Sequence, residues 1–204
     1  MDFQPTPLTH NDYDFQVKPA ATLRNLALVA LLGGFIPDER LLYPEKGDGL
    51  QVADLGGGPG MLANSLAFSY PKAQFHTVDH NPELAASAES LKSSFGHDNV
   101  TVHHGSIDSF NAAQTGPWDV AMSLDTYGQM AEADRPSVFN TIDNIKDGGL
   151  ALFSYNCAVF NTQFEPFREF IKLFATTQGN QPIEQTKSAL LLMQELVGEE
   201  AGYF

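Results

Sequence analysis

Residues 52–61 read VADLGGGPGM, and this stretch sets the expected fold of the chain. Its first residues continue an apolar run from Leu50, which suits a parallel strand buried on both faces. A strand that turns through glycine into a helix brings bare backbone N–H groups against a ligand. Asp54 stands two residues before the first glycine. The stretch therefore predicts a ligand site where the strand ends.

Strand and helix patterns alternate from this strand onward, which predicts right-handed crossovers and an α/β fold with a mainly parallel sheet. The predicted strands are 50–55, 74–79, 99–103, 118–124 and 149–155, and the predicted helices are 59–70, 82–95 and 132–145. KDGG at 146–149 predicts a turn before the last strand. Two more helices, at about 164–177 and 182–197, follow the sheet.

The chain is expected to divide into three parts. Residues 1–49 form an irregular arm and a helix that packs on the core, with Leu23, Leu26, Ala27 and Ala30 at helical spacing. Residues 50–160 form the Rossmann-like core that binds the ligand. Residues 161–204 form a helical segment that acts as a lid or an interface.

Composition excludes several classes of function. The 11 basic and 25 acidic residues give a net charge of −14, which disfavours a nucleic-acid partner. The single Cys157 forms no intrachain disulfide, and a cytoplasmic location is expected. The apolar run at 26–36 is about half a membrane span and is interpreted as a buried helix end, so no membrane partner is expected.

Three kinds of ligand could use the glycine turn. A triphosphate loop needs Gly-Lys-Ser/Thr, and Pro59-Gly60-Met61 has no lysine. A dinucleotide fingerprint fits only when it is counted as Gly58, Gly60 and Ala63 with Asp79 downstream, so an NAD(P)-dependent oxidoreductase stays open. The Asp54 carboxylate would oppose a diphosphate and favours a cationic ligand.

Asp54-x-Gly56-x-Gly58-x-Gly60 resembles the first motif of class I S-adenosylmethionine (SAM)-dependent methyltransferases. The resemblance implies SAM as cofactor and S-adenosylhomocysteine as product. It places the glycine turn and Asp54 along the methionine part, Asp79 at the ribose and Ser106 with Ile107 at the adenine. The implied cofactor-binding residues are Asp54, Gly56, Gly57, Gly58, Gly60, Asp79, His80, Ser106, Ile107, Leu124 and Tyr13.

Later segments are similar to bacterial methyltransferases whose catalytic domain precedes a methyltransferase regulatory domain, a group that includes lysine methyltransferases of outer-membrane proteins. These segments are YD at 13–14, TYGQM at 126–130, and NIKDGGLALFSYN at 144–156 with the helices that follow. The chain departs from that group at Gln129-Met130 and at 158–160, where the group tends to carry tryptophans. The sixth and seventh strands of class I domains have no counterpart after residue 178, which leaves open a fragment, a shortened relative or a fold completed by a partner chain.

The end of the fourth strand is expected to face the methyl acceptor. Asp125 and Tyr127 are predicted on the acceptor side, with Tyr155 and Asn156 opposite them. DTYG lacks the Asn/Asp-Pro-Pro pattern of amide and adenine methylation, and SYN supplies no carboxylate for a metal, so no metal is expected. Packing of Tyr127 and Tyr155 against the sheet is the alternative.

The expected function is therefore methyl transfer from SAM to a small molecule or a protein side chain, with lysine as one candidate. The rival interpretations are an NAD(P)-dependent oxidoreductase and a non-catalytic or truncated SAM-fold subunit. A homo-oligomer and a missing C-terminal domain both stay open.

Overall fold

A computed structural model describes residues 22–114, 116–155, 162, 165–175 and 182–197 of the 204-residue chain. The chain divides into two compact units, Met1–Tyr155 and Asn156–Phe204, and each is described by itself. Within the described residues, no helix is both long and apolar enough to cross a membrane.

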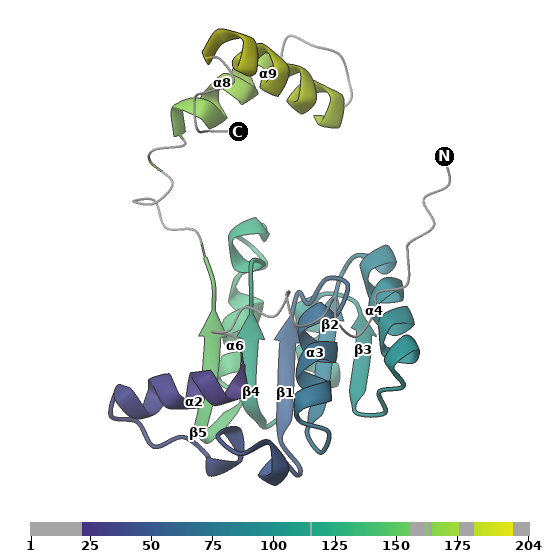
Figure 1. Ribbon diagram of the computed structural model, residues 1–204, viewed down its shortest axis with the longest axis vertical. Coiled ribbons are helices and arrows are strands. Elements are labelled where there is room, and N and C mark those ends of the chain that lie inside the picture. The colour runs from purple at the N-terminus through teal and green to yellow at the C-terminus, as the bar shows by residue number, and fades with distance from the viewer. Residues whose placement is uncertain (1–21, 115, 156–161, 163–164, 176–181, 198–204) are drawn as a thin grey trace. The chain divides into compact units, whose positions relative to one another are not determined.

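The first unit is built on a five-stranded sheet whose strands all run parallel, in the order β3-β2-β1-β4-β5 (Figure 1). Its strands are β1 (Gln51–Leu55), β2 (Gln74–Asp79), β3 (Val100–His104), β4 (Trp118–Ser123) and β5 (Ile145–Phe153). Its helices are α2 (Leu23–Leu32), η2 (Glu39–Leu41), η3 (Pro44–Lys46), α3 (Met61–Ser69), α4 (Pro82–Phe95), α5 (Ile107–Ala113), η4 (Tyr127–Gln129) and α6 (Pro136–Ile142). The order reverses between β1 and β4, so the chain leaves these two strands in opposite directions and opens a crevice at their carboxyl ends.

Helices cover both faces of the sheet, as the sequence predicts. On one face, Leu23 and Ala27 of α2 and Leu66 of α3 share a buried cluster with Val52 and Met122. On the other face, α5 and α6 bury a second cluster against the sheet, made of Ala53, Leu55, Val78, Ile107, Phe110, Trp118, Ala121 and Val138. Successive residues of β1, such as Val52 and Ala53, face opposite layers, which explains why both faces of this strand carry buried apolar residues.

The helix at 82–95 has the predicted bounds because local signals mark both of its ends. Asn81 caps it, accepting from the Glu83 and Leu84 amides at 2.9 and 3.4 Å, and Pro82 occupies the first turn. Gly96 ends it in the left-handed conformation, with φ 66°.

The structure corrects three predicted elements. The predicted helix 132–145 begins only at Pro136 and ends at Ile142. The predicted turn KDGG, residues 146–149, lies inside β5. Trp118 of β4 pairs with Ile145, and Val120 pairs with Leu150. Residues 146–149 therefore form a bulge opposite the single residue between Trp118 and Val120. Helix α5 follows β3, although the sequence predicts no helix between the strands 99–103 and 118–124; Ser106 caps it by accepting from the Ser109 amide.

The apolar run at 26–36 is also corrected, because it is not a buried helix end. Leu32, Phe35 and Ile36 are 89%, 72% and 88% exposed in the described part of the chain. Only Leu23 and Ala27 of α2 are buried, which shows that the helix packs on the core through its first two turns.

The second unit contains α8 (Glu165–Ala175) and α9 (Pro182–Val197), which contact each other. Phe170 and Phe174 of α8 stack with their ring centroids 6.3 Å apart. The prediction that this segment serves as a lid or an interface stays a prediction.

Candidate active site

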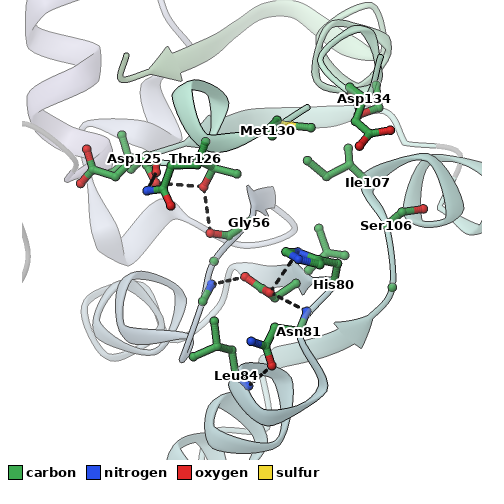
Figure 2. A pocket seen from close by; sticks show the side chains of 18 of the residues that line it. Gly56, His80, Asn81, Leu84, Ser106, Ile107, Asp125, Thr126, Met130 and Asp134 are labelled. Carbon is green, nitrogen blue, oxygen red and sulfur yellow. Dashed lines mark hydrogen bonds and ion pairs between the residues drawn. The ribbon is translucent and has the colours of Figure 1, made fainter. Parts of the chain in front are cut away.

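A cavity of about 560 Å³ lies at the carboxyl ends of the strands (Figure 2). The loops that follow β1, β2, β3 and β4 contribute its wall, which matches the expected place of a ligand at a switch point. The lining residues are Gly56, Gly57, Gly58, Pro59, Val78, Asp79, His80, Asn81, Leu84, Gly105, Ser106, Ile107, Asp108, Leu124, Asp125, Thr126, Gln129, Met130, Ala131, Asp134 and Ser137.

The glycine turn forms the floor on the β1 side. The amides of Gly56 and Gly57 both donate to the Val78 carbonyl, at 2.9 and 3.0 Å, so the turn is fastened to β2. A Cβ on Gly57 would overlap the Thr77 hydroxyl and the Asp54 carboxylate. The turn can therefore pack in this way only if residue 57 has no side chain.

Asp79 closes β2 and braces the same turn. Its Oδ2 accepts from the Gly58 amide at 2.9 Å, and its Oδ1 accepts from the Asn81 amide at 2.9 Å. A carboxylate has about four acceptor positions, so roughly two remain after these backbone bonds. Asp79 thus joins the loops after β1 and β2 while it lines the cavity.

Asp54 lies beneath the glycine turn and is not among the lining residues. Its side chain is 3% exposed, and its Oδ2 accepts from the Thr77 hydroxyl at 3.2 Å. The pKa of Asp54 is raised to about 7, mainly by burial; the Thr77 hydrogen bond partly offsets this rise, and the nearby Asp79 charge adds to it. Asp54 is therefore placed to act on a ligand through the turn.

The wall after β3 combines a helix start with an apolar side chain. Ser106 accepts from the Ser109 amide at 3.1 Å as the N-cap of α5, and Ile107 is 8% exposed. Leu84 of α4 is also a lining residue, so two aliphatic side chains flank this part of the cavity (Figure 2). A flat, apolar ring would fit between such groups.

The loop after β4 brings Leu124, Asp125 and Thr126 into the wall. Tyr127 is not a lining residue; its ring contacts Phe139 edge to face at 5.7 Å and lies under the Arg135 guanidinium at 5.5 Å. Tyr127 thus contacts the start and the middle of α6, and its predicted place on the acceptor side stays a prediction.

Several other predicted site residues lie away from the cavity wall or outside the described residues. Tyr155 is 69% exposed and does not line the cavity. Gly60 is buried where α3 begins. A Cβ there would overlap Ala88 of α4, so this glycine allows α3 and α4 to pack closely. Tyr13 and Asn156 lie outside the described residues.

Sequence reasoning missed part of the wall. Asn81, Leu84 and Asp134 line the cavity outside the motifs named above, and Thr126 lines it as the first residue of TYGQM but was not predicted as a site residue. The available signal for Asn81 is its place directly after Asp79 and before the predicted helix 82–95. The TYGQM segment contains Thr126 but gave no reason to single it out, because its contact is with Gly56, 70 residues away in the chain.

The polar and apolar groups that line the cavity fit an adenosyl ligand. Asp79 offers acceptors for a pair of ribose hydroxyls, and Ile107 and Leu84 offer apolar contact for a base. The glycine turn supplies close backbone, and a volume of about 560 Å³ is within the usual range for small-molecule sites.

The sheet order, the glycine turn and the acid that closes β2 together define a class I methyltransferase fold. A family model described as a methyltransferase domain matches residues 46–196, and the chain belongs to this family. The cofactor of this family and fold is S-adenosylmethionine, as the sequence predicts. Family membership favours methyl transfer over the NAD(P) interpretation.

Two solved structures share this fold, and one further protein is similar in sequence. PKMT2 from Rickettsia typhi, in complex with AdoHcy, is 21% identical with a TM-score of 0.67, and the match covers 87% of this chain and 33% of that one. An O-methyltransferase family protein from Burkholderia thailandensis is 14% identical with a TM-score of 0.50, covering 84% and 52%. An uncharacterized Synechocystis sp. protein, sll1526, is 25% identical over 165 residues, covering 80% and 33%. The chain spans about a third of the length of the first and third of these proteins.

Proposed function

We propose that this cavity binds S-adenosylmethionine and directs its methyl group to an amine acceptor, with a lysine side chain as the favoured one. The observation that carries the cofactor part is Asp79, whose carboxylate braces the glycine turn and still faces the cavity. When bound, the cofactor supplies an activated methyl group on a sulfonium, which is already a good leaving group.

The chain's own residues have three tasks at the cofactor. Asp79 accepts hydrogen bonds from the ribose hydroxyls at the acceptor positions of its carboxylate that the Gly58 and Asn81 amides do not use. The turn at Gly56, Gly57 and Gly58 lies along the methionine part, with Asp54 behind it. Ile107 and Leu84 contact the adenine.

An amine acceptor is favoured by the charge of the wall. Asp108, Asp125 and Asp134 line the cavity together with Asp79, and none of the described lining residues is Lys or Arg. Carboxylates attract a cationic acceptor, and the net charge of −14 draws basic peptides toward the protein. The resemblance to bacterial lysine methyltransferases points in the same direction.

The acceptor nitrogen must lose a proton before it can attack the methyl group. A lysine with a reference pKa of about 10.4 is neutral at pH 7 only at a cost of roughly 4.6 kcal/mol. Asp125 is exposed and lines the cavity, so it can hold the ammonium and accept the proton. Alignment of the nitrogen with the methyl group supplies the remaining acceleration.

The cofactor part is tested by calorimetric titration of the wild type and Asp79→Asn with SAM, S-adenosylhomocysteine and NAD(P). Wild type should bind the first two ligands, and Asp79→Asn should bind them at least about tenfold more weakly, because an amide replaces a charged acceptor. Asp98→Asn is the matched control, since Asp98 is exposed and lies outside the cavity. Binding of NAD(P) alone would contradict the proposal.

The acceptor part is tested with labelled SAM and peptides that carry lysine, acetyl-lysine or arginine at one position. Label should enter only the lysine peptide, and Asp125→Asn should reduce the rate at saturating SAM. Asp98→Asn should leave that rate unchanged. Wild-type protein that binds SAM but labels no acceptor would instead support a non-catalytic subunit.

A further inference from the structure

The loop after β4 is fastened to the glycine turn by one side chain. Thr126 Oγ1 donates to the Gly56 carbonyl at 3.0 Å and lies 3.1 Å from the Leu124 carbonyl (Figure 2). A Cβ on Gly56, whose φ is +71°, would overlap the Thr126 side chain. Gly56 therefore leaves room for Thr126 at the point where the turn and the loop meet.

Asp125, the residue before Thr126, is held by a residue that follows β5. Asp125 has a φ of 56°, the only positive value among the described non-glycine residues. Ser154, directly after β5, holds it twice: Ser154 Oγ accepts from the Asp125 amide at 2.6 Å and donates to Asp125 Oδ1 at 3.1 Å. The strained backbone of Asp125 is thus maintained by contacts on both sides of the loop.

The same loop closes on itself beyond Thr126. The Gln129 amide donates to the Thr126 carbonyl at 2.8 Å, and Gln129 Nε2 donates to the Asp125 carbonyl at 2.6 Å. Gln129 and Met130 line the cavity. A shift of Thr126 would therefore move the whole wall on the acceptor side.

We infer that Thr126 is a positioning residue that holds the acceptor-side loop, residues 124–130, at a fixed distance from the glycine turn. Its hydroxyl acts through Gly56 on one side and through Asp125 and Gln129 on the other. The inference rests on the proposed methyl transfer, in which the cofactor lies on the turn and the acceptor on the loop. Misplacement by about 1 Å of groups that align reactants can cost on the order of 100-fold in rate.

The test compares Thr126→Val, which removes the hydroxyl but keeps the shape, with Thr126→Ser, which keeps the hydroxyl. Amide hydrogen exchange is followed by NMR at Asp125 and Gln129, with Ala85 in α4 as the reference for global opening. In the free protein, Thr126→Val should speed exchange at Asp125 and Gln129 by about 3- to 10-fold and leave Ala85 unchanged. Thr126→Ser should exchange like the wild type.

Addition of S-adenosylhomocysteine gives a second measurement. In the wild type and in Thr126→Ser, this ligand should slow amide exchange at Asp125 and Gln129. In Thr126→Val, it should slow amide exchange at the glycine turn but not at Asp125 or Gln129. Unchanged exchange in free Thr126→Val, or equal acceleration at Ala85, would overturn the inference. A wild type that binds no S-adenosylhomocysteine contradicts the proposed function instead, and the free-protein comparison still decides the role of Thr126.

Discussion

Asp54 has an unusual position for a carboxylate, beneath a glycine turn and nearly without solvent contact. Burial is the main reason that its pKa is raised to about 7, and the Thr77 hydroxyl only partly offsets that effect. Because the folded state holds this proton more tightly than the unfolded chain, the contribution of Asp54 to stability is greatest at low pH. That contribution is lost as the pH rises from about 4 through 7.

Replacement of Asp54 by Asn removes the titration and keeps the shape of the side chain. Between pH 5 and pH 8, the free energy of unfolding of the wild type should fall by about 2 kcal/mol relative to Asp54→Asn. Urea unfolding at a series of pH values measures the difference. A difference that does not change with pH would show that Asp54 ionises normally in the folded protein.

Single residues were predictable where their chemistry is local. Asp79, Gly56, Gly57 and Gly58 could be placed at the cavity because the spacing within a strand–turn–helix unit is fixed by geometry. Tyr127 could not be placed, because its contacts with Phe139 and Arg135 depend on how α6 packs. Thr126 was missed for the same reason, since its partner Gly56 comes from a different strand.

At the scale of elements, strong end signals gave correct bounds and weak signals did not. Asn81-Pro82 and Gly96 mark α4 without ambiguity. The two glycines at 148–149 suggested a turn, but a positive φ of 80° at Gly148 allows β5 to bulge and continue. Whether glycine ends a strand or bulges it depends on the neighbouring strand, which the local sequence does not contain.

The neighbouring strands β2 and β3 carry two histidines, His76 and His103, whose rings stack against each other. His76 Nδ1 lies 3.2 Å from His103 Nε2, and Trp118 and Phe110 contact the two rings edge on. Burial lowers the pKa of both histidines, and for His76 the charge of His103 lowers it further. The folded state therefore binds fewer protons than the unfolded chain, and stability falls as the pH drops through about 6.5.

Replacing His103 with Gln should weaken this pH dependence. The loss in free energy of unfolding between pH 7.5 and pH 5 should be smaller in His103→Gln than in the wild type. His104→Gln is the matched control, because His104 is the next residue and is exposed. Equal losses in all three proteins, measured by urea unfolding, would contradict the assignment.

At the scale of the whole molecule, the two ends of the sheet have separate roles. The carboxyl ends form the cavity, whereas the amino ends are joined by a buried carboxylate, Asp119, which is 2% exposed. Its Oδ1 accepts from Arg40 at 2.8 Å, and its Oδ2 accepts from the Gln51 amide at 2.8 Å and from Lys146 at 2.7 Å. One side chain thus connects η2, β1, β4 and β5.

Because Asp119 lies at the opposite end of the sheet from the cavity, its removal should separate stability from binding. Asp119→Ala leaves the Gln51 amide and two cations without this acceptor, so the free energy of unfolding should fall by about 2–3 kcal/mol. The calorimetric affinity for S-adenosylhomocysteine should stay within about twofold of the wild type where both proteins are folded, since a twofold change is only about 0.4 kcal/mol.

Glu39→Ala is the control for charge alone, because it breaks the exposed Lys46–Glu39 pair and should cost less than about 1 kcal/mol. A large loss of S-adenosylhomocysteine affinity in Asp119→Ala, with folding intact, would mean that the bulge at 146–149 transmits strain along β4 to Leu124 and the cavity. An affinity that is retained would mean that the parallel sheet acts as a rigid spacer between its two ends, so that the cavity depends on local fastenings such as Asp79 and Thr126.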